Sequence, residues 1–419
     1  ANFDIRHHVI RHALPARARR RELARYVSEL ARAPMPRDRP AWQFHLVDNV
    51  DGRSALVARI HHSYADGIAL VRVMLAMTDA SVDAPPAMPF ATSERARTGK
   101  HAAGAGDTLS AALATARKIG RTIIDKGAEI WSDPGKAVAL ADQGSALAGE
   151  IATLAMMRED AATRFKGVPG VRKHVAWADP LALADVKTIG RALGASINDV
   201  VMTCVAGALA MYLRDKGDAV AGKTIRALVP VNLRPIERAC DLGNQFGLVF
   251  VDLPLGIDNP VERLAVVRAN MNALKQSHQP VLALGLLAAM GAGPRMLQEA
   301  LLAALSRNAT AVLTNVPGPA QALYMAGAKI DDLMFWVPQS GDIGLGLSVI
   351  SYAGGVQFGV IVDHRFCPDP ERIVTHFAAA FETLVLATLM APWPRHGDLD
   401  PDDALAAVLH AREPARKAS

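Results

Sequence analysis

Two stretches of regularly spaced apolar residues, separated by a long segment of different composition, constrain the fold of this 419-residue chain most. Residues 1–80 and 171–395 show strand and helix spacing, whereas Ala, Gly, Pro and Ser dominate residues 81–170. Alternating strand and helix patterns are typical of α/β domains. We therefore expect an N-terminal half (1–80), a helical crossover linker (81–170), a C-terminal half (171–395) and a tail (396–419).

The N-terminal half contains a clear hairpin signal. Residues 43–50 and 54–60 alternate around Asp51-Gly52, a pair that favours the two-residue turns of β-hairpins. An early strand is predicted at 5–14 and an amphipathic helix at 21–32. The hairpin thus delivers its last residues to the start of a further helix, at about 68–78.

The C-terminal half carries more elements of both kinds. Its strongest pattern is an amphipathic helix that Ser196 would cap. Helices are predicted at 181–193, 196–212, 260–277, 281–306 and 370–390, and strands at 171–176, 224–231, 245–254, 310–316, 321–330, 343–352 and 356–363. We expect mixed sheets, of the α+β kind, in two facing domains.

Charge and cysteine content narrow the possible partners. The net charge is only +5, and no Lys/Arg block interleaves with aromatic residues, so nucleic acid is not an expected partner. Nine arginines face three acids in residues 11–39, which could meet an anionic membrane or phosphates, or be a solvated helix face. Three cysteines give no disulfide framework and suggest a reducing compartment. The apolar run at 281–292 is too short to span a bilayer.

Directly after the hairpin comes His61-His62-Ser63-Tyr64-Ala65-Asp66-Gly67. Histidine, with an unperturbed pKa of about 6.5, suits proton transfer at neutral pH. Asp66 could brace the loop or cap the next helix, and Gly67 permits close packing. The pattern indicates a general base, with a core histidine at a strand end as the alternative.

Other site chemistries lack their motifs. Zinc is disfavoured because neither His-Glu-x-x-His nor paired Cys-x-x-Cys occurs, and we expect no metal. No Gly-x-Ser-x-Gly elbow offers a serine nucleophile. The glycines at 341–346 have the wrong spacing for a dinucleotide fold.

Four ordered motifs, covering nearly the whole chain, resemble those of the bacterial wax ester synthase/diacylglycerol acyltransferase family. That family belongs to the chloramphenicol-acetyltransferase-like, coenzyme A-dependent acyltransferases. The motifs are the His-His-x-x-x-Asp-Gly heptapeptide at 61–67, the Asn-Asp helix start at 196–201, the strand and loop at 229–235 with Gly243-Asn244, and the Asn-Val-Pro-Gly-Pro turn at 314–319.

The resemblance implies two chloramphenicol-acetyltransferase-like domains facing a central tunnel, and direct acyl transfer from a long-chain acyl-CoA to diacylglycerol or a fatty alcohol. His62 would be the base, with His61 and Gly67 beside it. Asp66 would hold the loop through an arginine, with Arg234 the first choice and Arg59 the second. The supporting residues would be Asn198, Asp199, Arg234, Thr314 and Asn315. For Asn198 and Asp199, helix capping stays an equal alternative.

Several further expectations follow from the resemblance. Acyl-CoA is a co-substrate, and no cofactor is expected. The protein would work in the cytoplasm, with contact to the inner membrane or lipid droplets, and the sequence leaves its oligomeric state open. In the family a strand and a helix precede the position of residue 1, and Ala41 stands where leucine is usual. An acyltransferase for glycolipid or polyketide alcohols, or a silent lipid-binding homologue, are the alternatives.

Overall fold

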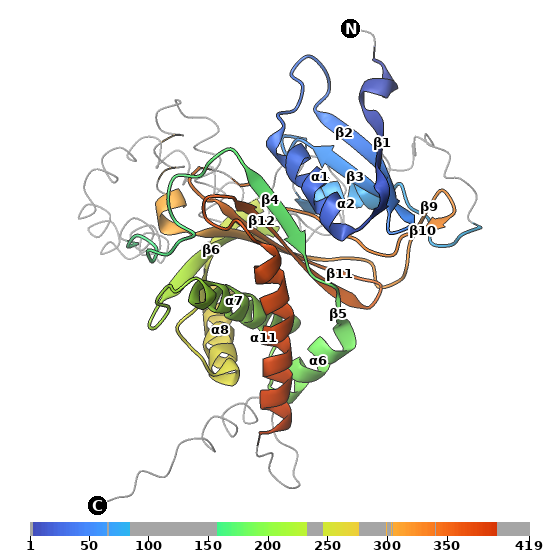
Figure 1. The fold of residues 1–419 in the computed structure, drawn as a ribbon. Helices are drawn as coiled ribbons and strands as arrows, with labels where there is room; N and C mark the ends of the chain where they lie inside the picture. The colour runs from blue at the N-terminus through green and yellow to red at the C-terminus, as the bar shows by residue number, and fades with distance from the viewer. Residues whose placement is uncertain are drawn as a thin grey trace, which may run out of the picture.

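The computed structural model describes residues 3–64, 67–83, 157–232, 246–275, 299, 303, 305–339 and 341–391. These residues form two sheet-based halves (Figure 1). The helix predicted at 281–306 lies outside the described residues except for its last turn. The helices predicted in the linker fall within residues 84–156, which are also outside the described residues.

The N-terminal half is a three-stranded sheet in the order β1-β2-β3. It consists of β1 (Val9–Ala18), β2 (Trp42–Val50) and β3 (Arg53–Ile60), preceded by the 3-10 helix η1 (Ile5–His7). β2 and β3 form the predicted antiparallel hairpin, and Asp51 and Gly52 adopt φ values of 53° and 76° at its turn. Positive φ at both positions is what a type I′ turn requires. The early strand begins at Val9 rather than at Ile5, because residues 5–7 coil into η1.

The C-terminal half is built on a seven-stranded mixed sheet. Its order is β4-β12-β11-β8-β6-β7, and β5 also pairs with β12. β8 runs parallel to both β11 and β6, whereas the other pairs are antiparallel. The strands are β4 (Lys173–Trp177), β5 (Leu181–Ala182), β6 (Thr224–Asn232), β7 (Phe246–Pro254), β8 (Ala311–Pro317), β11 (Leu345–Tyr352) and β12 (Gly355–Asp363).

One predicted strand is wrong. Residues 321–330 form a small antiparallel hairpin instead, made of β9 (Tyr324–Met325) and β10 (Ala328–Lys329). The turn between them places Ala326 at φ 49° and Gly327 at φ 78°, so the chain reverses where the sequence pattern suggested continuity. A backbone bridge joins Tyr324 to Asp79, which ties this hairpin to the N-terminal half.

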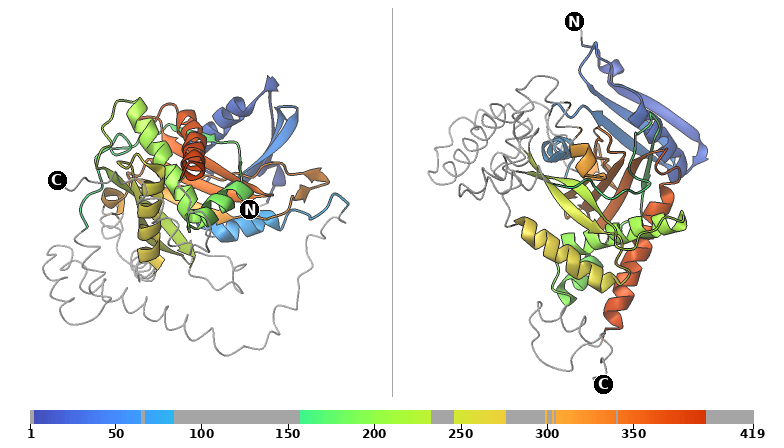
Figure 2. Two further views of the ribbon diagram at one scale, coloured as in Figure 1. Left: turned by 90° about the horizontal axis from the view of Figure 1, so that it is seen from below. Right: turned by 90° about the vertical axis from the view of Figure 1, so that its left-hand side faces the viewer.

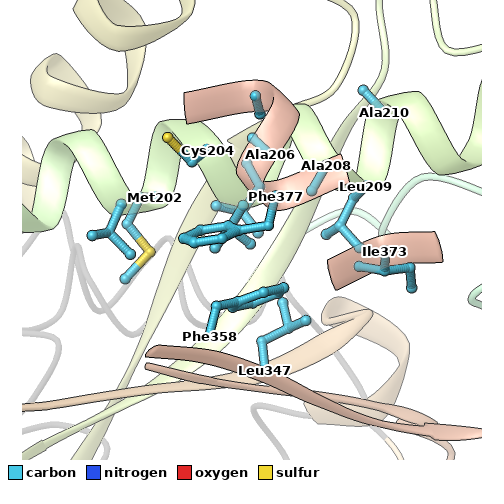
Figure 3. Packing of buried hydrophobic residues seen from close by; sticks show 14 of the residues in the cluster. Met202, Cys204, Ala206, Ala208, Leu209, Ala210, Leu347, Phe358, Ile373 and Phe377 are labelled. Carbon is cyan, nitrogen blue, oxygen red and sulfur yellow. The ribbon is translucent and has the colours of Figure 1, made fainter. Parts of the chain in front are cut away.

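Helices cover the face of the large sheet that points away from the small sheet (Figures 1 and 2). They are α6 (Leu183–Ala192), α7 (Ile197–Asp215), α8 (Pro260–Lys275) and α11 (Glu371–Leu389). The main core lies between them and the sheet (Figure 3). There Phe358 of β12 stacks on Phe377 of α11 with ring centroids 4.4 Å apart, and Leu209 of α7 is fully buried.

α7 and α11 are also long and apolar enough, by length and composition alone, to cross a membrane. In α7, 78% of the 18-residue apolar stretch is buried inside the protein, as in a core helix. In α11, 39% of the corresponding stretch is buried. Leu386, Leu389 and Met390 at the end of α11 are exposed.

Helix α1 (Arg20–Arg32) lies between the two sheets. Leu23 and Tyr26 pack on the small sheet, against a cluster formed by Leu14, Ala18 and Val47. Ala24 and Val27 pack on the large sheet, against Val175 of β4 and Ile361 of β12. The hydroxyl of Ser28 accepts a hydrogen bond from the Val175 N–H at 3.0 Å. The predicted mixed α/β, two-domain fold is therefore confirmed, whereas the tunnel between the domains stays a prediction.

The core position of Leu209 gives a stability prediction. Leu209→Ala should lower the free energy of unfolding by about 2–5 kcal/mol, because it removes buried methyl groups and leaves a cavity. Leu389→Ala, at a site that is 72% exposed, is the control and should change it by less than about 0.5 kcal/mol. Urea unfolding curves of both variants test this. Equal losses would contradict the assignment of α7 as the core helix.

Candidate active site

The two histidines lie in a turn at the end of β3. The last pair of the β2–β3 ladder is Trp42 with Ile60, and the His61 N–H extends it by donating to the Ala41 carbonyl at 2.9 Å. The Tyr64 N–H closes the turn on the His61 carbonyl at 3.1 Å. His61 is exposed and His62 is half-buried. A rigid hairpin thus carries the histidine pair, as the sequence predicted.

The ring of His61 is engaged within this turn. Its Nδ1 accepts the Ser63 N–H at 3.2 Å and lies 2.8 Å from the Ser63 hydroxyl oxygen. Because a backbone N–H can only donate, Nδ1 must be the unprotonated nitrogen, and the ring proton of the neutral form sits on Nε2. His61 therefore stabilises the local conformation of the turn.

Of the two arginines expected to bind Asp66, the structure describes Arg59 alone. Asp66 and Arg234 lie outside the described residues, and of Gly67 the structure gives the backbone, as the first residue of α2 (Gly67–Leu75). Arg59 donates to the Gln43 side-chain oxygen at 2.8 Å and to the Ala33 carbonyl. Burial lowers the pKa of this guanidinium.

A buried polar cluster supports the hairpin from the α1 side. The Tyr26 hydroxyl lies 2.8 Å from His45 Nδ1. Burial, followed by the nearby charge of Arg59, lowers the pKa of His45, and burial raises the pKa of Tyr26. This favours neutral forms of both groups, so the cluster joins α1 to β2 without a buried charge pair.

At the start of α7, Asp199 forms a capping box with Ser196. Asp199 Oδ2 accepts the Ser196 N–H at 2.8 Å and its hydroxyl at 2.7 Å, while the Ser196 oxygen accepts the Asp199 N–H at 3.2 Å. Such reciprocal bonds satisfy N–H groups that the first helical turn leaves free. The structure thus gives Asp199 the capping role that the sequence analysis held as an equal alternative.

Two of the predicted supporting residues meet across the C-terminal half. The Asn315 side-chain amide on β8 donates to the Asn198 side-chain oxygen at the start of α7, at 2.7 Å. Thr314 precedes Asn315 on β8, so its side chain points to the opposite face of the sheet. Its hydroxyl is buried and has no hydrogen-bond partner among the described residues. The helix start and the strand end are therefore linked at the Asn-Val-Pro-Gly-Pro turn.

The cysteines that the structure describes do not suit nucleophilic chemistry. Cys204 and Cys367 are both buried, and burial raises their pKa to about 12 and about 11. A thiol becomes a nucleophile only as the thiolate, which these environments suppress. Within the described ranges there is also no group of three or more His, Cys, Asp or Glu side chains able to hold a metal ion.

Sequence reasoning missed the residues that anchor the histidine turn. The Ala41 N–H donates to the Tyr64 hydroxyl at 3.2 Å, next to the His61–Ala41 bond. A signal was present, because the predicted hairpin pairing places the residues just before 42 opposite those just after 60. The choice of Tyr64 as the partner depends on a side-chain direction that the pattern does not contain.

Comparison with known proteins identifies relatives for both halves. Residues 1–201 match the wax ester synthase/diacylglycerol acyltransferase catalytic domain, and residues 242–385 match the C-terminal domain of the same family. A probable diacylglycerol O-acyltransferase of Mycobacterium tuberculosis is 29% identical over 396 residues, which cover 91% of this chain and 82% of the relative. A second, putative one from the same organism is 28% identical, covering 92% and 75%.

A solved structure shares the fold. The wax ester synthase/diacylglycerol acyltransferase of Marinobacter aquaeolei VT8 superposes with a TM-score of 0.64 at 23% sequence identity, covering 93% of this chain and 82% of its own.

The capping box gives a prediction that separates a structural from a chemical role of Asp199. Ser196→Ala should lower the free energy of unfolding by about 1 kcal/mol, because an N-terminal N–H of α7 loses its acceptor. In a double-mutant cycle with Asp199→Ala, measured by urea unfolding, the two losses should be clearly non-additive. Thr188→Ala on α6, which removes an exposed hydroxyl bound to the Ala184 carbonyl, is the control. Additive losses would contradict the capping role.

Proposed function

The chain belongs to the wax ester synthase/diacylglycerol acyltransferase family and is an acyltransferase, and we propose that it transfers a long-chain acyl group from acyl-CoA to diacylglycerol or a long-chain alcohol. The observation that carries the proposal is the His61-His62 turn at the end of a rigid hairpin, within the region that matches the family's catalytic domain. The products would be triacylglycerol or a wax ester.

In the proposed reaction, His62 is the general base. It takes the proton of the acceptor hydroxyl while that oxygen attacks the thioester carbonyl carbon. The carbon–sulfur bond then breaks, and the coenzyme A sulfur leaves with the proton that His62 returns. General-base catalysis of this kind contributes roughly 10²–10⁴ to the rate. Alignment of the two substrates would supply much of the rest.

The environments of the two histidines support this division of roles. His61 is exposed and its Nδ1 is engaged by Ser63, whereas His62 is half-buried at the tip of the same turn. A base that works away from bulk water is better placed to act on a bound lipid hydroxyl. Asp66 would brace the turn through Arg234, with Arg59 as the second choice.

For the supporting residues we propose a positioning role. The Asn198–Asn315 bond ties the first turn of α7 to the end of β8 on one face of the sheet, and the Thr314 hydroxyl is buried without a described partner on the other face. Fixed amide and hydroxyl dipoles of this kind suit a site in which charge develops on a carbonyl oxygen. In this proposal acyl-CoA is a co-substrate and no further cofactor takes part.

We also propose that the protein works in the cytoplasm and contacts the inner membrane or lipid droplets through α1. One face of α1 is buried between the sheets, while Arg21, Arg25 and Arg32 are exposed. Exposed basic side chains attract anionic lipid surfaces at about 1 kcal/mol each. The lipid acceptor partitions into such surfaces, so contact would bring the enzyme to its substrate.

The proposed base is tested by acyl-CoA-dependent turnover. His62→Ala should lower kcat by roughly 10²–10⁴, because it removes the proton acceptor. Its melting temperature is measured alongside to show that the variant is folded. Release of free CoA is measured with diacylglycerols, long-chain alcohols and glycolipid or polyketide alcohols as acceptors. His61→Ala is the matched control and should retain more activity than His62→Ala. Full turnover by His62→Ala would contradict the assignment of His62 as the base. If the wild type binds acyl-CoA without releasing CoA, the protein is instead a catalytically silent lipid-binding homologue.

The membrane surface is tested with vesicles that contain anionic phosphatidylglycerol. Binding at low salt should weaken as salt screens the charges. Replacing Arg21, Arg25 and Arg32 by Glu should weaken it roughly 100-fold or more, because three favourable charges are lost and reversed. The control replaces Lys187, Arg191 and Lys275, which are exposed on α6 and α8, by Glu. The net charge changes by the same amount, and vesicle binding should weaken less. Equal effects would contradict a surface centred on α1.

A further inference from the structure

Both backbone groups of Ala41 bind the turn that carries the histidines. The Ala41 carbonyl accepts the His61 N–H at 2.9 Å, and the Ala41 N–H donates to the Tyr64 hydroxyl oxygen at 3.2 Å. The first bond is an ordinary extension of the β2–β3 ladder. The second replaces the next ladder bond with a side chain, at the point where the chain leaves the sheet.

The Ala41 end of this contact is itself held in place. The Trp42 N–H donates to the Pro40 carbonyl at 2.9 Å, so the chain turns tightly before β2 begins. Trp42 also stacks on His8 of the N-terminal segment, with ring centroids 4.3 Å apart. Tyr64 is therefore attached to a fixed point of the sheet.

The two bonds fix the ends of the segment that contains His62. His61 is tied to Ala41 through its N–H and to Tyr64 through its carbonyl, and Tyr64 is tied to Ala41 through its hydroxyl. His62 is one of two residues between these tied positions. Without the phenol bond, the Tyr64 end of the turn would lose this attachment to Ala41.

We propose that Tyr64 is a positioning residue, whose hydroxyl holds the turn so that His62 points at the reacting hydroxyl. The inference rests on the proposed role of His62 as the base. Proton transfer depends on the alignment of donor and acceptor, and a misplacement of about 1 Å can lower a rate by about 10². One lost neutral hydrogen bond allows a smaller displacement, so we expect a loss of about 3- to 10-fold.

The phenol oxygen accepts a bond from Ala41, so its own O–H is left to donate elsewhere, and the side chain is 42% exposed. A direct contact of this O–H with a substrate is the rival explanation. The two are separable because positioning works through the Ala41 N–H, which can be removed independently.

The primary experiment compares the steady-state kinetics of Tyr64→Phe with those of the wild-type enzyme, with diacylglycerol as the acceptor and a long-chain acyl-CoA as the donor. We expect kcat to fall about 3- to 10-fold while KM for both substrates stays unchanged, because binding groups are untouched and the base is misaligned. Tyr26→Phe is the matched control. It removes a phenol bonded to His45 between α1 and the hairpin, and should lower the melting temperature with a smaller effect on kcat.

The second arm removes the same bond from its other side. Ala41→Pro lacks the N–H that donates to Tyr64, and it should reproduce the fall in kcat. The double variant Ala41→Pro with Tyr64→Phe should fall no further. Ala41→Leu keeps both backbone groups and should behave as the wild type.

Wild-type kcat in Tyr64→Phe, or a change confined to KM, would overturn the inference. A further fall in kcat when Tyr64→Phe is added to Ala41→Pro would overturn it in favour of a substrate contact. Its failure is distinguishable from that of the proposed function. If His62→Ala is inactive while Tyr64→Phe is unaffected, only the role of Tyr64 falls. If His62→Ala keeps full turnover, both fall.

Discussion

The burial of two adjacent faces of helix α1, one on each sheet, is the interaction on which the arrangement of the two halves depends. Leu23 and Tyr26 cover the inner face of the small sheet, whereas Ala24 and Val27 cover β4 and β12 of the large one. A helix that buries only one face can slide or rotate at modest cost, but one packed between two sheets cannot move without opening an apolar contact. The hairpin that carries His61 and His62 is consequently held at a set orientation to the C-terminal half.

Local pattern was sufficient for elements whose signal lies within one stretch of sequence. The hairpin followed from Asp51-Gly52 between alternating residues, and α7 from Ser196 before a long apolar periodicity. The parallel pairing of β1 with β2, and of β8 with β6 and β11, was beyond reach because such pairings join distant segments and leave no local pattern. The strand predicted at 321–330 failed because Ala326, which is rarely found at positive φ, begins the turn.

The candidate site shows the same division. Residue types at motif positions predict which side chains belong to it, and the Asn198–Asn315 bond shows that two motifs far apart in sequence do meet. What each residue does was less accessible. Asp199 is engaged in the capping box, and the Ala41–Tyr64 contact depends on a side chain crossing from one strand end to another. The absence of leucine at position 41 matters little for that contact, because it uses the backbone alone.

The route of acyl transfer can be argued from the chemistry of the described residues. A covalent acyl-enzyme would need an activated nucleophile near the histidine turn. Cys204 and Cys367 are sealed in the core, where burial holds their pKa too high for a thiolate at neutral pH. The Ser63 hydroxyl lies 2.8 Å from His61 Nδ1, so a route through Ser63 would use His61 and not His62 as its base. A histidine base on a rigid hairpin is suited instead to activating a hydroxyl that the substrate itself brings. In the proposed reaction, direct attack on the thioester requires of the fold only that both substrates and His62 be aligned, and a turn that is held at both ends would meet that requirement.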